Sequence, residues 1–224
     1  MSTLRISRTH FPVTALGPGL RLGIWVQGCT LACKGCMSQD TWNPVGGTEV
    51  EVDDLVVLWR KAVGAGADGL TISGGEPLQQ PAALRDLLRA VRRETGLDKD
   101  VLLFTGYDET ELDEVRRGAA DLVDVLVTGR YDVAAPTSRI WRGSANQRMV
   151  LRTELARRRY AEYVDHEPES PRLQVGPAGD GGVWIIGVPR RGALPGLTQD
   201  LRAMGLPPQN VTWRPSRDST PTGE

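Results

Sequence analysis

The chain has 224 residues, of which 40% are hydrophobic and 25% are charged, and its formal net charge is -1. These values are those of a globular protein with a sizeable core, and they exclude a fibrous or a largely disordered chain. The charge balance gives no basic surplus for nucleic acid. Residues 1–10 are polar and alternating, and no apolar run approaches the roughly 20 residues of a membrane span, so we expect a cytoplasmic protein.

From Leu20 onward, segments typical of strands alternate with segments typical of helices over about the first two thirds of the chain. Strands are predicted at 20–26, 69–73, 100–104 and 124–127, and helices at 52–63, 81–94 and 109–117. Repeated βα units of this kind build an α/β fold with a parallel sheet and helices outside it. Ligands of such sheets bind at the carboxyl ends of the strands, so we expect the functional site there.

Three short polar motifs follow predicted strands directly. They are Gly74-Gly75-Glu76-Pro77, Thr105-Gly106-Tyr107 and Thr128-Gly129-Arg130. Adjacent glycines let the backbone approach a ligand closely, and a carboxylate beside them can receive an ammonium group. A glycine pair alone is more typical of a tight turn. The pair Gly74-Gly75, however, follows a strand of the same predicted sheet as a loop that contains three cysteines, and this placement favours a ligand site.

All three cysteines lie within eight residues, as Cys29-Thr-Leu-Ala-Cys33-Lys-Gly-Cys36, directly after the first predicted strand. Three thiolates at this spacing can hold three corners of a [4Fe–4S] cluster, which normally takes four cysteines, so one iron stays open. An open metal position is typical of catalysis. A zinc site completed by His10 or His166 is a weaker alternative, because neither histidine has the short spacing of zinc loops. A disulfide is weaker still, because one of the three thiols would remain.

Together these motifs resemble the radical S-adenosylmethionine (SAM) enzymes. The resemblance rests on Gln27-Gly28, the CxxxCxxC loop, Asp40-Thr41-Trp42 and the Gly-Gly-Glu-Pro segment. Within that superfamily the chain is similar to the glycyl-radical activating enzymes, most closely those of anaerobic ribonucleoside-triphosphate reductase. Further matches are the glycine before Cys36, Thr105-Gly106-Tyr107, and the segments 124–130 and 142–148. The resemblance covers about residues 4–150 and implies a partial, laterally open (βα) barrel.

The resemblance also implies the ligands of the site. Cys29, Cys33 and Cys36 would bind three irons of a [4Fe–4S] cluster, and SAM would chelate the fourth through its amino and carboxylate groups. Gly74, Gly75 and Glu76 would hold the methionyl end of SAM, chiefly its ammonium.

The adenine end of SAM is less well defined by the sequence. Many members of the superfamily have an aromatic residue just before the last cysteine, where this chain has Gly35. The reductase activases tend to have tyrosine after that cysteine, where this chain has Met37. Met37 or Tyr107 is therefore expected to contact adenine. Asn146 and Arg148 are expected either to line the same cavity or to form a polar loop that closes the sheet.

The implied reaction begins with an external electron donor such as flavodoxin or ferredoxin. Reductive cleavage of SAM gives methionine and a 5′-deoxyadenosyl radical, which abstracts hydrogen from a glycine of a partner protein. No catalytic acid or base is expected, because the cofactor carries the chemistry and the protein orients it and excludes water. Two alternatives stay open, which are modification of a small molecule or peptide, and a non-catalytic module that only binds a cluster.

The chain continues past this core, and we divide it into a radical SAM core at 1–150, an α+β extension at 151–214 and a disordered tail at 215–224. The extension is predicted to contain a helix ending at Tyr163, strands at 172–175 and 183–188 around a glycine-rich turn, a helix at 197–204 and a strand at 211–213. It would cap the cavity for a small substrate, dock a protein, or cover an apolar edge of the sheet.

Overall fold

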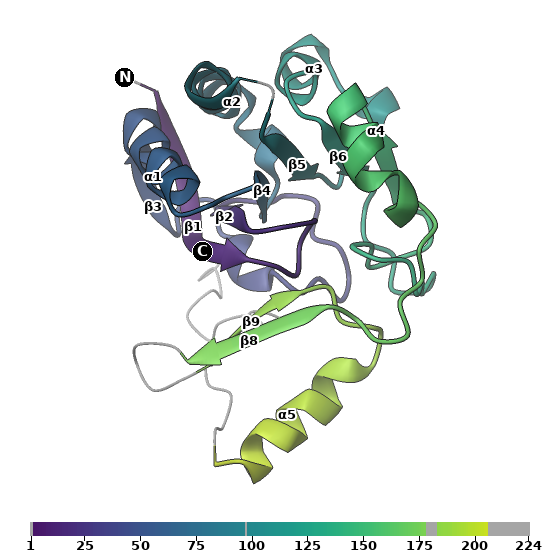
Figure 1. The fold of residues 1–224 in the computed structure, drawn as a ribbon. Helices are drawn as coiled ribbons and strands as arrows, with labels where there is room; N and C mark the ends of the chain where they lie inside the picture. Colours follow the sequence, from purple (N-terminus) through teal and green to yellow (C-terminus); the bar gives the residue numbers. More distant parts are fainter. Residues whose placement is uncertain (1, 97, 178–182, 206–224) are drawn as a thin grey trace, which may run out of the picture.

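The computed structural model describes residues 2–96, 98–177 and 183–205, and one mixed sheet organises them (Figure 1). Seven strands lie in the order β3-β1-β2-β4-β5-β6-β7. Strands β2, β4, β5 and β6 are parallel, whereas β1, β3 and β7 pair antiparallel at the two sides. The bounds are β1 Thr3–Val13, β2 Arg21–Val26, β3 Thr48–Glu51, β4 Gly69–Gly74, β5 Asp100–Phe104, β6 Val125–Thr128 and β7 Arg148–Leu151.

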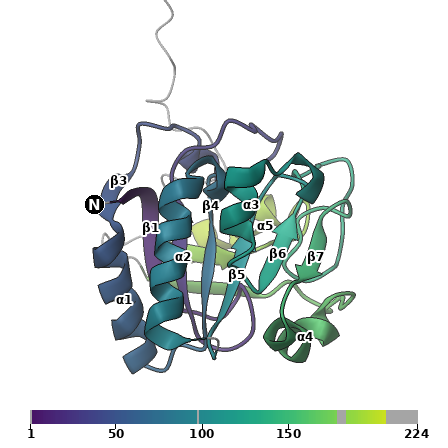
Figure 2. The ribbon, with the colours of Figure 1, turned by 90° about the horizontal axis from the view of Figure 1, so that it is seen from above.

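Three helices cover one face of this sheet, namely α1 (Val52–Gly64), α2 (Pro81–Thr95) and α3 (Glu114–Ala120) (Figures 1 and 2). Proline at the first position of α2 suits a helix start, because its missing N–H would have no partner there. The buried residues of α2 recur at helical spacing and face the sheet, as Leu84, Leu87, Leu88 and Val91.

The two faces of the sheet carry separate apolar cores, because side chains alternate along each strand. In β2, Leu22 and Ile24 pack with the helices, whereas Trp25 belongs to the second core. The same alternation places Leu103 of β5 on the helical side and Leu102 on the other side. The parallel strands are therefore buried on both faces, which explains their nearly continuous apolar sequences.

The extension covers the face opposite the helices with its hairpin and its last helix, whereas its first helix lies beside β6 and β7 (Figure 1). It consists of α4 (Glu154–Tyr160), the hairpin β8 (Leu173–Pro177) and β9 (Val183–Gly187), and α5 (Ala193–Ala203). Ile186 of β9 is buried in the second core, and the Trp184 ring lies 4.3 Å from the His10 ring between centroids. The Gln174 amide accepts from the Thr14 N–H at 2.8 Å and donates to the Pro12 carbonyl at 2.8 Å. The hairpin thus packs on a face of the sheet.

The predicted α/β fold with parallel strands and helices outside the sheet is confirmed, although the sheet is mixed and only mostly parallel. The flanking strands β1, β3 and β7 were not predicted. The helix predicted at 109–117 was wrong in its bounds, because two caps divide it. Asp108 and Glu111 form a capping box around a short 3-10 turn, and Asp113 then starts α3 by accepting from the Arg116 N–H at 2.8 Å.

Two differences concern the extension. Helix α4 ends at Tyr160 and is followed by a 3-10 turn, Ala161–Tyr163, and α5 begins at Ala193, four residues before the predicted start. The predicted strand at 211–213, the tail at 215–224 and most of the glycine-rich turn lie outside the described residues. Within the described residues, no helix is both long and apolar enough to cross a bilayer.

A buried charge network fixes the amino ends of the parallel strands. Arg21 of β2 and Asp100 of β5 are fully buried and form a forked ion pair with N–O distances of 2.7 and 3.0 Å. The Tyr160 hydroxyl donates to the Asp100 carboxylate at 2.6 Å, and burial raises the pKa of Tyr160, so this hydroxyl keeps its proton. The network therefore attaches α4 to the sheet.

Replacing Tyr160 with phenylalanine should lower the free energy of unfolding by about 1–3 kcal/mol, because the buried Asp100 carboxylate loses a donor. Urea unfolding followed by circular dichroism measures this change. Glu94→Gln is the control, since it breaks an exposed pair with Arg60 and should change the free energy of unfolding by less than about 1 kcal/mol. Equal effects of the two variants would contradict the assigned role of Tyr160.

Candidate functional site

The cysteine loop follows β2 directly and is closed at its base by backbone hydrogen bonds. The N–H groups of Gly28 and Cys29 donate to the carbonyls of Thr41 and Trp42 at 2.7 and 3.1 Å. A tight turn joins the other two cysteines, because the Cys36 N–H donates to the Cys33 carbonyl at 3.1 Å. All three thiols are free and half-buried. The loop thus presents three sulfur ligands from one short segment.

The Gly-Gly-Glu segment lies against the beginning of this loop. The Gly75 N–H donates to the Val26 carbonyl at 2.8 Å, and the Glu76 N–H donates to the Gly28 carbonyl at 2.9 Å. A Cβ on Gly75 would lie 2.3 Å from the Gly28 oxygen, so only glycine permits this approach. The structure therefore brings together the two motifs that the sequence analysis placed at one edge of the sheet.

The Glu76 side chain is only 1% exposed and binds protein donors on two segments. Its carboxylate accepts from the Leu78 N–H at 2.9 Å, the Thr105 hydroxyl at 2.8 Å and the Gly106 N–H at 2.7 Å. Burial raises the pKa of Glu76 to about 7, although these three donors oppose the shift. The carboxylate thus joins the carboxyl end of β4 to that of β5.

Tyr107 lies at the same end of the sheet, beside the cysteine loop. Its hydroxyl accepts from the Gln79 amide at 3.2 Å, and the same amide donates to the Thr30 hydroxyl at 2.7 Å. The guanidinium carbons of Arg116 and Arg130 lie 4.9 and 5.9 Å from the centre of the Tyr107 ring. The ring is therefore held close to residues of the loop.

The other predicted contacts with SAM are more peripheral. Met37 is half-buried, directly after Cys36. Asn146 is exposed, and its amide donates to the Arg130 carbonyl at 2.8 Å. Arg148 is exposed on β7, where it pairs with Thr128 at the carboxyl end of β6. Their roles toward SAM stay predictions.

The sequence did not indicate how two glutamines, Gln27 and Gln80, hold the loop in place. The Gln27 amide donates to the carbonyls of Asp40 and Asn43 at 3.2 and 2.8 Å, which fixes the chain after the last cysteine. The Gln80 amide donates to the Gln27 carbonyl at 3.0 Å. The sequence shows that Gln27 directly precedes Gly28-Cys29. It does not show which distant carbonyl groups an amide side chain reaches.

The donor set fits a cluster better than a single ion. In the part of the chain that the structure describes, no three His, Cys, Asp or Glu side chains are placed to hold one metal ion. The histidines of the zinc alternative make other contacts, because the His10 ring packs on Trp184 and the His166 ring lies 6.2 Å from that of Tyr163. Three thiols on one loop are soft ligands, which iron–sulfur clusters prefer.

Comparison with known proteins agrees with this chemistry. Residues 15–150 match the family model described as a 4Fe-4S single cluster domain. The chain is 38% identical over 144 residues to the anaerobic ribonucleoside-triphosphate reductase-activating protein of Vibrio cholerae. The aligned residues cover 92% of that protein and 62% of this chain. It is 37% and 34% identical to the proteins of the same name from Haemophilus influenzae and Escherichia coli K12, over 62% of this chain and 92% and 93% of theirs.

The chain belongs to the family of these 4Fe–4S activating proteins. Membership confirms the predicted resemblance and the prediction of an iron–sulfur enzyme. The matched range of this chain includes all three cysteines and the Gly-Gly-Glu segment. It ends at residue 150, so α4, the hairpin and α5 lie outside the matched part.

The raised pKa of Glu76 predicts a pH dependence of stability. Between pH 4.5 and about 7 the native state keeps a proton that the unfolded chain has lost, so stability falls as the pH rises through this range. Glu76→Gln has no charge in either state. From pH 4.5 to 8, the free energy of unfolding of the native sequence should therefore fall by about 3 kcal/mol relative to Glu76→Gln.

Urea unfolding of the cluster-free protein at several pH values measures this difference. Glu169→Gln changes an exposed carboxylate and is the control, since its pH profile should follow that of the native sequence. A Glu76→Gln profile parallel to that of the native sequence would show that the buried carboxyl does not titrate as expected.

Proposed function

We propose that this chain is the activating enzyme of a glycyl-radical protein. It cleaves SAM reductively at a [4Fe–4S] cluster held by Cys29, Cys33 and Cys36, and the resulting radical abstracts hydrogen from a glycine of its partner. The observation that supports the proposal best is the backbone contact between the Gly-Gly-Glu segment and the residue before Cys29. The names of the relatives suggest an anaerobic ribonucleoside-triphosphate reductase as the partner.

The three thiolates leave one iron for SAM, since each binds a single iron. When bound, the reduced cluster supplies the electron that breaks a carbon–sulfur bond of SAM and gives methionine and a 5′-deoxyadenosyl radical. The protein holds the sulfur ligands on a loop whose two ends are fixed by backbone hydrogen bonds. Partial exposure of the cysteines suits electron delivery by an external protein such as flavodoxin or ferredoxin.

The ammonium of SAM is received by backbone in this proposal. The Glu76 carboxylate is occupied by three protein donors and is buried, so it acts by positioning the segment. We assign the ammonium to the carbonyl oxygens of Gly74 and Gly75, which lie beside the beginning of the loop. Tyr107 is the favoured adenine contact because its hydroxyl is linked through Gln79 to Thr30, next to Cys29. Met37, Asn146 and Arg148 are the other candidate contacts with SAM.

The placement of the extension favours a protein substrate over a small one. Its contacts at Pro12 and Thr14 lie beside Val13, which pairs with Arg21 at the beginning of β2. The cysteines follow the other end of β2. The carboxyl ends of the strands, where a glycine loop of a partner would approach, are therefore not covered by these contacts. We further infer a core of about 1–150 with the partial barrel of radical SAM enzymes, and a cytoplasmic location.

Anaerobic reconstitution with iron and sulfide tests the proposal. With dithionite and SAM, the protein should release 5′-deoxyadenosine, detected by chromatography. Cys33→Ala should stay folded but fail to assemble the cluster, and product should fall to background. With the candidate reductase added, electron paramagnetic resonance should show a glycyl radical. Product formation on a metabolite alone, without a radical on any protein, would favour the small-molecule alternative.

Gly75→Ala should lower SAM cleavage at least tenfold while the cluster still assembles. The added Cβ would lie 2.3 Å from the Gly28 oxygen, and it would push the Gly-Gly-Glu segment away from the cysteine loop. Displacement of a binding group by about 1 Å is enough for a loss of this size or more. The measurements are cluster absorbance and the rate of 5′-deoxyadenosine release.

Gly118→Ala is the matched control, because its added Cβ on helix α3 would meet no atom within 4 Å beyond its neighbours and the backbone of its own helix. It should keep the rate and stabilise the fold slightly, since alanine favours a helix interior. Native rates in Gly75→Ala would remove the assigned role of this close contact.

A further inference from the structure

The segment that joins β6 to β7 reaches back to the cysteine loop, and its Tyr131 ring lies between two glycines. A Cβ added at Gly35 would lie 3.4 Å from Cε1 of this ring. A Cβ added at Gly143 would lie 2.9 Å from Cδ2, on the opposite side of the ring. Val133 contacts the same turn, since its Cγ2 would lie 3.4 Å from the Cβ at Gly35. The turn before Cys36 therefore packs on side chains of a separate segment.

Glycine at position 35 leaves the space that this ring fills. Its φ of +78° lies in the left-handed region, which residues with a side chain rarely adopt. The hydrogen bonds within the turn are local, because the Cys36 N–H donates to the Cys33 carbonyl at 3.1 Å and the Ser38 N–H donates to the Cys36 Sγ at 3.4 Å. These bonds shape the turn, and the contact with Tyr131 joins it to the chain that follows β6.

Hydrogen bonds hold the backbone on both sides of Tyr131. The Asn146 amide donates to the Arg130 carbonyl at 2.8 Å. The Asp132 N–H donates to the hydroxyl of buried Ser144 at 3.0 Å. The residues before and after the tyrosine are therefore attached to the chain that enters β7, and the direction of the ring is fixed.

Gln147 fixes the glycine on the other side of the ring. Its amide donates to the Gly129 carbonyl at 2.9 Å, and its oxygen accepts from the Gly143 N–H at 2.7 Å. This single side chain thus connects the end of β6 with the glycine on which Tyr131 packs. The polar residues of 143–147 therefore act together to place the ring against the cysteine loop.

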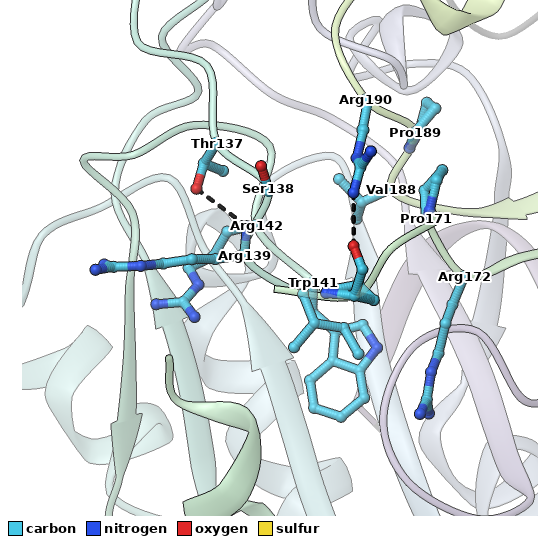
Figure 3. A pocket seen from close by; sticks show the side chains of 12 residues that line it. Thr137, Ser138, Arg139, Trp141, Arg142, Pro171, Arg172, Val188, Pro189 and Arg190 are labelled. Carbon is cyan, nitrogen blue, oxygen red and sulfur yellow. Dashed lines mark hydrogen bonds between the residues drawn. The ribbon is translucent and has the colours of Figure 1, made fainter. Parts of the chain in front are cut away.

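Trp141 attaches the same segment to the second apolar core. Its indole N–H donates to the Ala15 carbonyl at 3.0 Å, and the residue is only 3% exposed. Its φ of +57° is rare for a residue with a side chain, and the buried contacts of the indole hold it there. Figure 3 shows Trp141 among residues 137–142, which line a hollow beside the extension. The segment is therefore fixed at a second point, besides its contact with Gly35.

We propose that Tyr131 is a positioning residue for the iron–sulfur cluster. Its ring holds the turn that carries Cys33 and Cys36, so both thiolates keep the arrangement that the cluster requires. An aromatic ring suits this task, because it fills a large space with few rotatable bonds. The inference rests on the proposed function in that these cysteines bind the cluster, and it extends that function to a residue outside the cysteine loop.

Amide hydrogen exchange of the cluster-free full chain tests the contact without the cofactor. In Tyr131→Ala, the Cys36 and Ser38 amides should exchange at least about tenfold faster than in the native sequence, because the turn opens locally. The amides of Leu87 and Leu88 on α2 should keep their native rates. Tyr131→Phe keeps the ring, so it should keep native rates at all four amides. Nuclear magnetic resonance resolves these amides individually.

The reconstituted protein gives a second reading. A chelator should remove iron from Tyr131→Ala about tenfold faster than from the native sequence, because groups around metal ligands change metal affinity by factors of this size. Tyr131→Phe should lose iron at the native rate. Native exchange and native iron loss in Tyr131→Ala would overturn the proposal. Equal losses in Tyr131→Phe and Tyr131→Ala would also overturn it, because the ring would then not be the group that acts.

Gly143→Ala keeps the test decisive if Tyr131→Ala fails to fold. Its Cβ would lie 2.9 Å from the ring, so the ring must move, and the Cys36 amide should exchange about threefold faster or more. Gly118→Ala is again the matched control and should leave this rate unchanged. Equal rates in the two glycine variants would contradict the role of the ring.

These results are separable from the test of the proposed function. If the native protein releases no 5′-deoxyadenosine but shows the expected exchange and iron loss, SAM cleavage is removed and the role of Tyr131 stands. If all variants keep native exchange and iron loss while the native protein cleaves SAM, the role of Tyr131 is removed and the proposed function stands.

Discussion

The structure of the site depends on the approach of Gly75 to the Gly28 carbonyl, which a side chain at position 75 would prevent. Two backbone hydrogen bonds fix this approach and join the carboxyl ends of β2 and β4. The Glu76 carboxylate extends the connection to β5 through Thr105 and Gly106. Desolvation of this carboxylate is unfavourable, and three donors offset part of that cost. The cysteine loop thus begins on a rigid base formed by three strands.

Much of this arrangement follows from the sequence, because parallel strands buried on both faces are almost entirely apolar. Strand β5 was predicted with its bounds, and β2 and β4 to within one residue. In contrast, β1 was not predicted, although Leu4 and Ile6 are buried and alternate with polar residues. The four-residue strands β3 and β7 give little local signal, since their pairing depends on distant segments.

The chemistry of the site was also accessible from the residue types, whereas its atomic contacts were not. Cysteine spacing indicates a cluster without reference to a fold. The side chain of Glu76 illustrates the limit. Besides the nearby Leu78 N–H, its carboxylate accepts from donors 29 and 30 residues away, which its sequence position did not indicate. Contacts over such separations are set by the register of neighbouring strands, which local patterns do not determine.

The carboxyl and amino ends of the parallel strands differ in the ionisable groups that they carry. At the carboxyl ends, the half-buried cysteines lie near the buried Glu76 carboxyl. At the amino ends, the forked pair of Arg21 and Asp100 is fully buried and attaches α4 through Tyr160. The extension is built onto this second end and onto the adjoining face of the sheet, through Gln174 and Ile186. The described residues beyond the family's matched part therefore add a surface at the amino ends of the parallel strands, whereas the cysteine loop begins at their carboxyl ends.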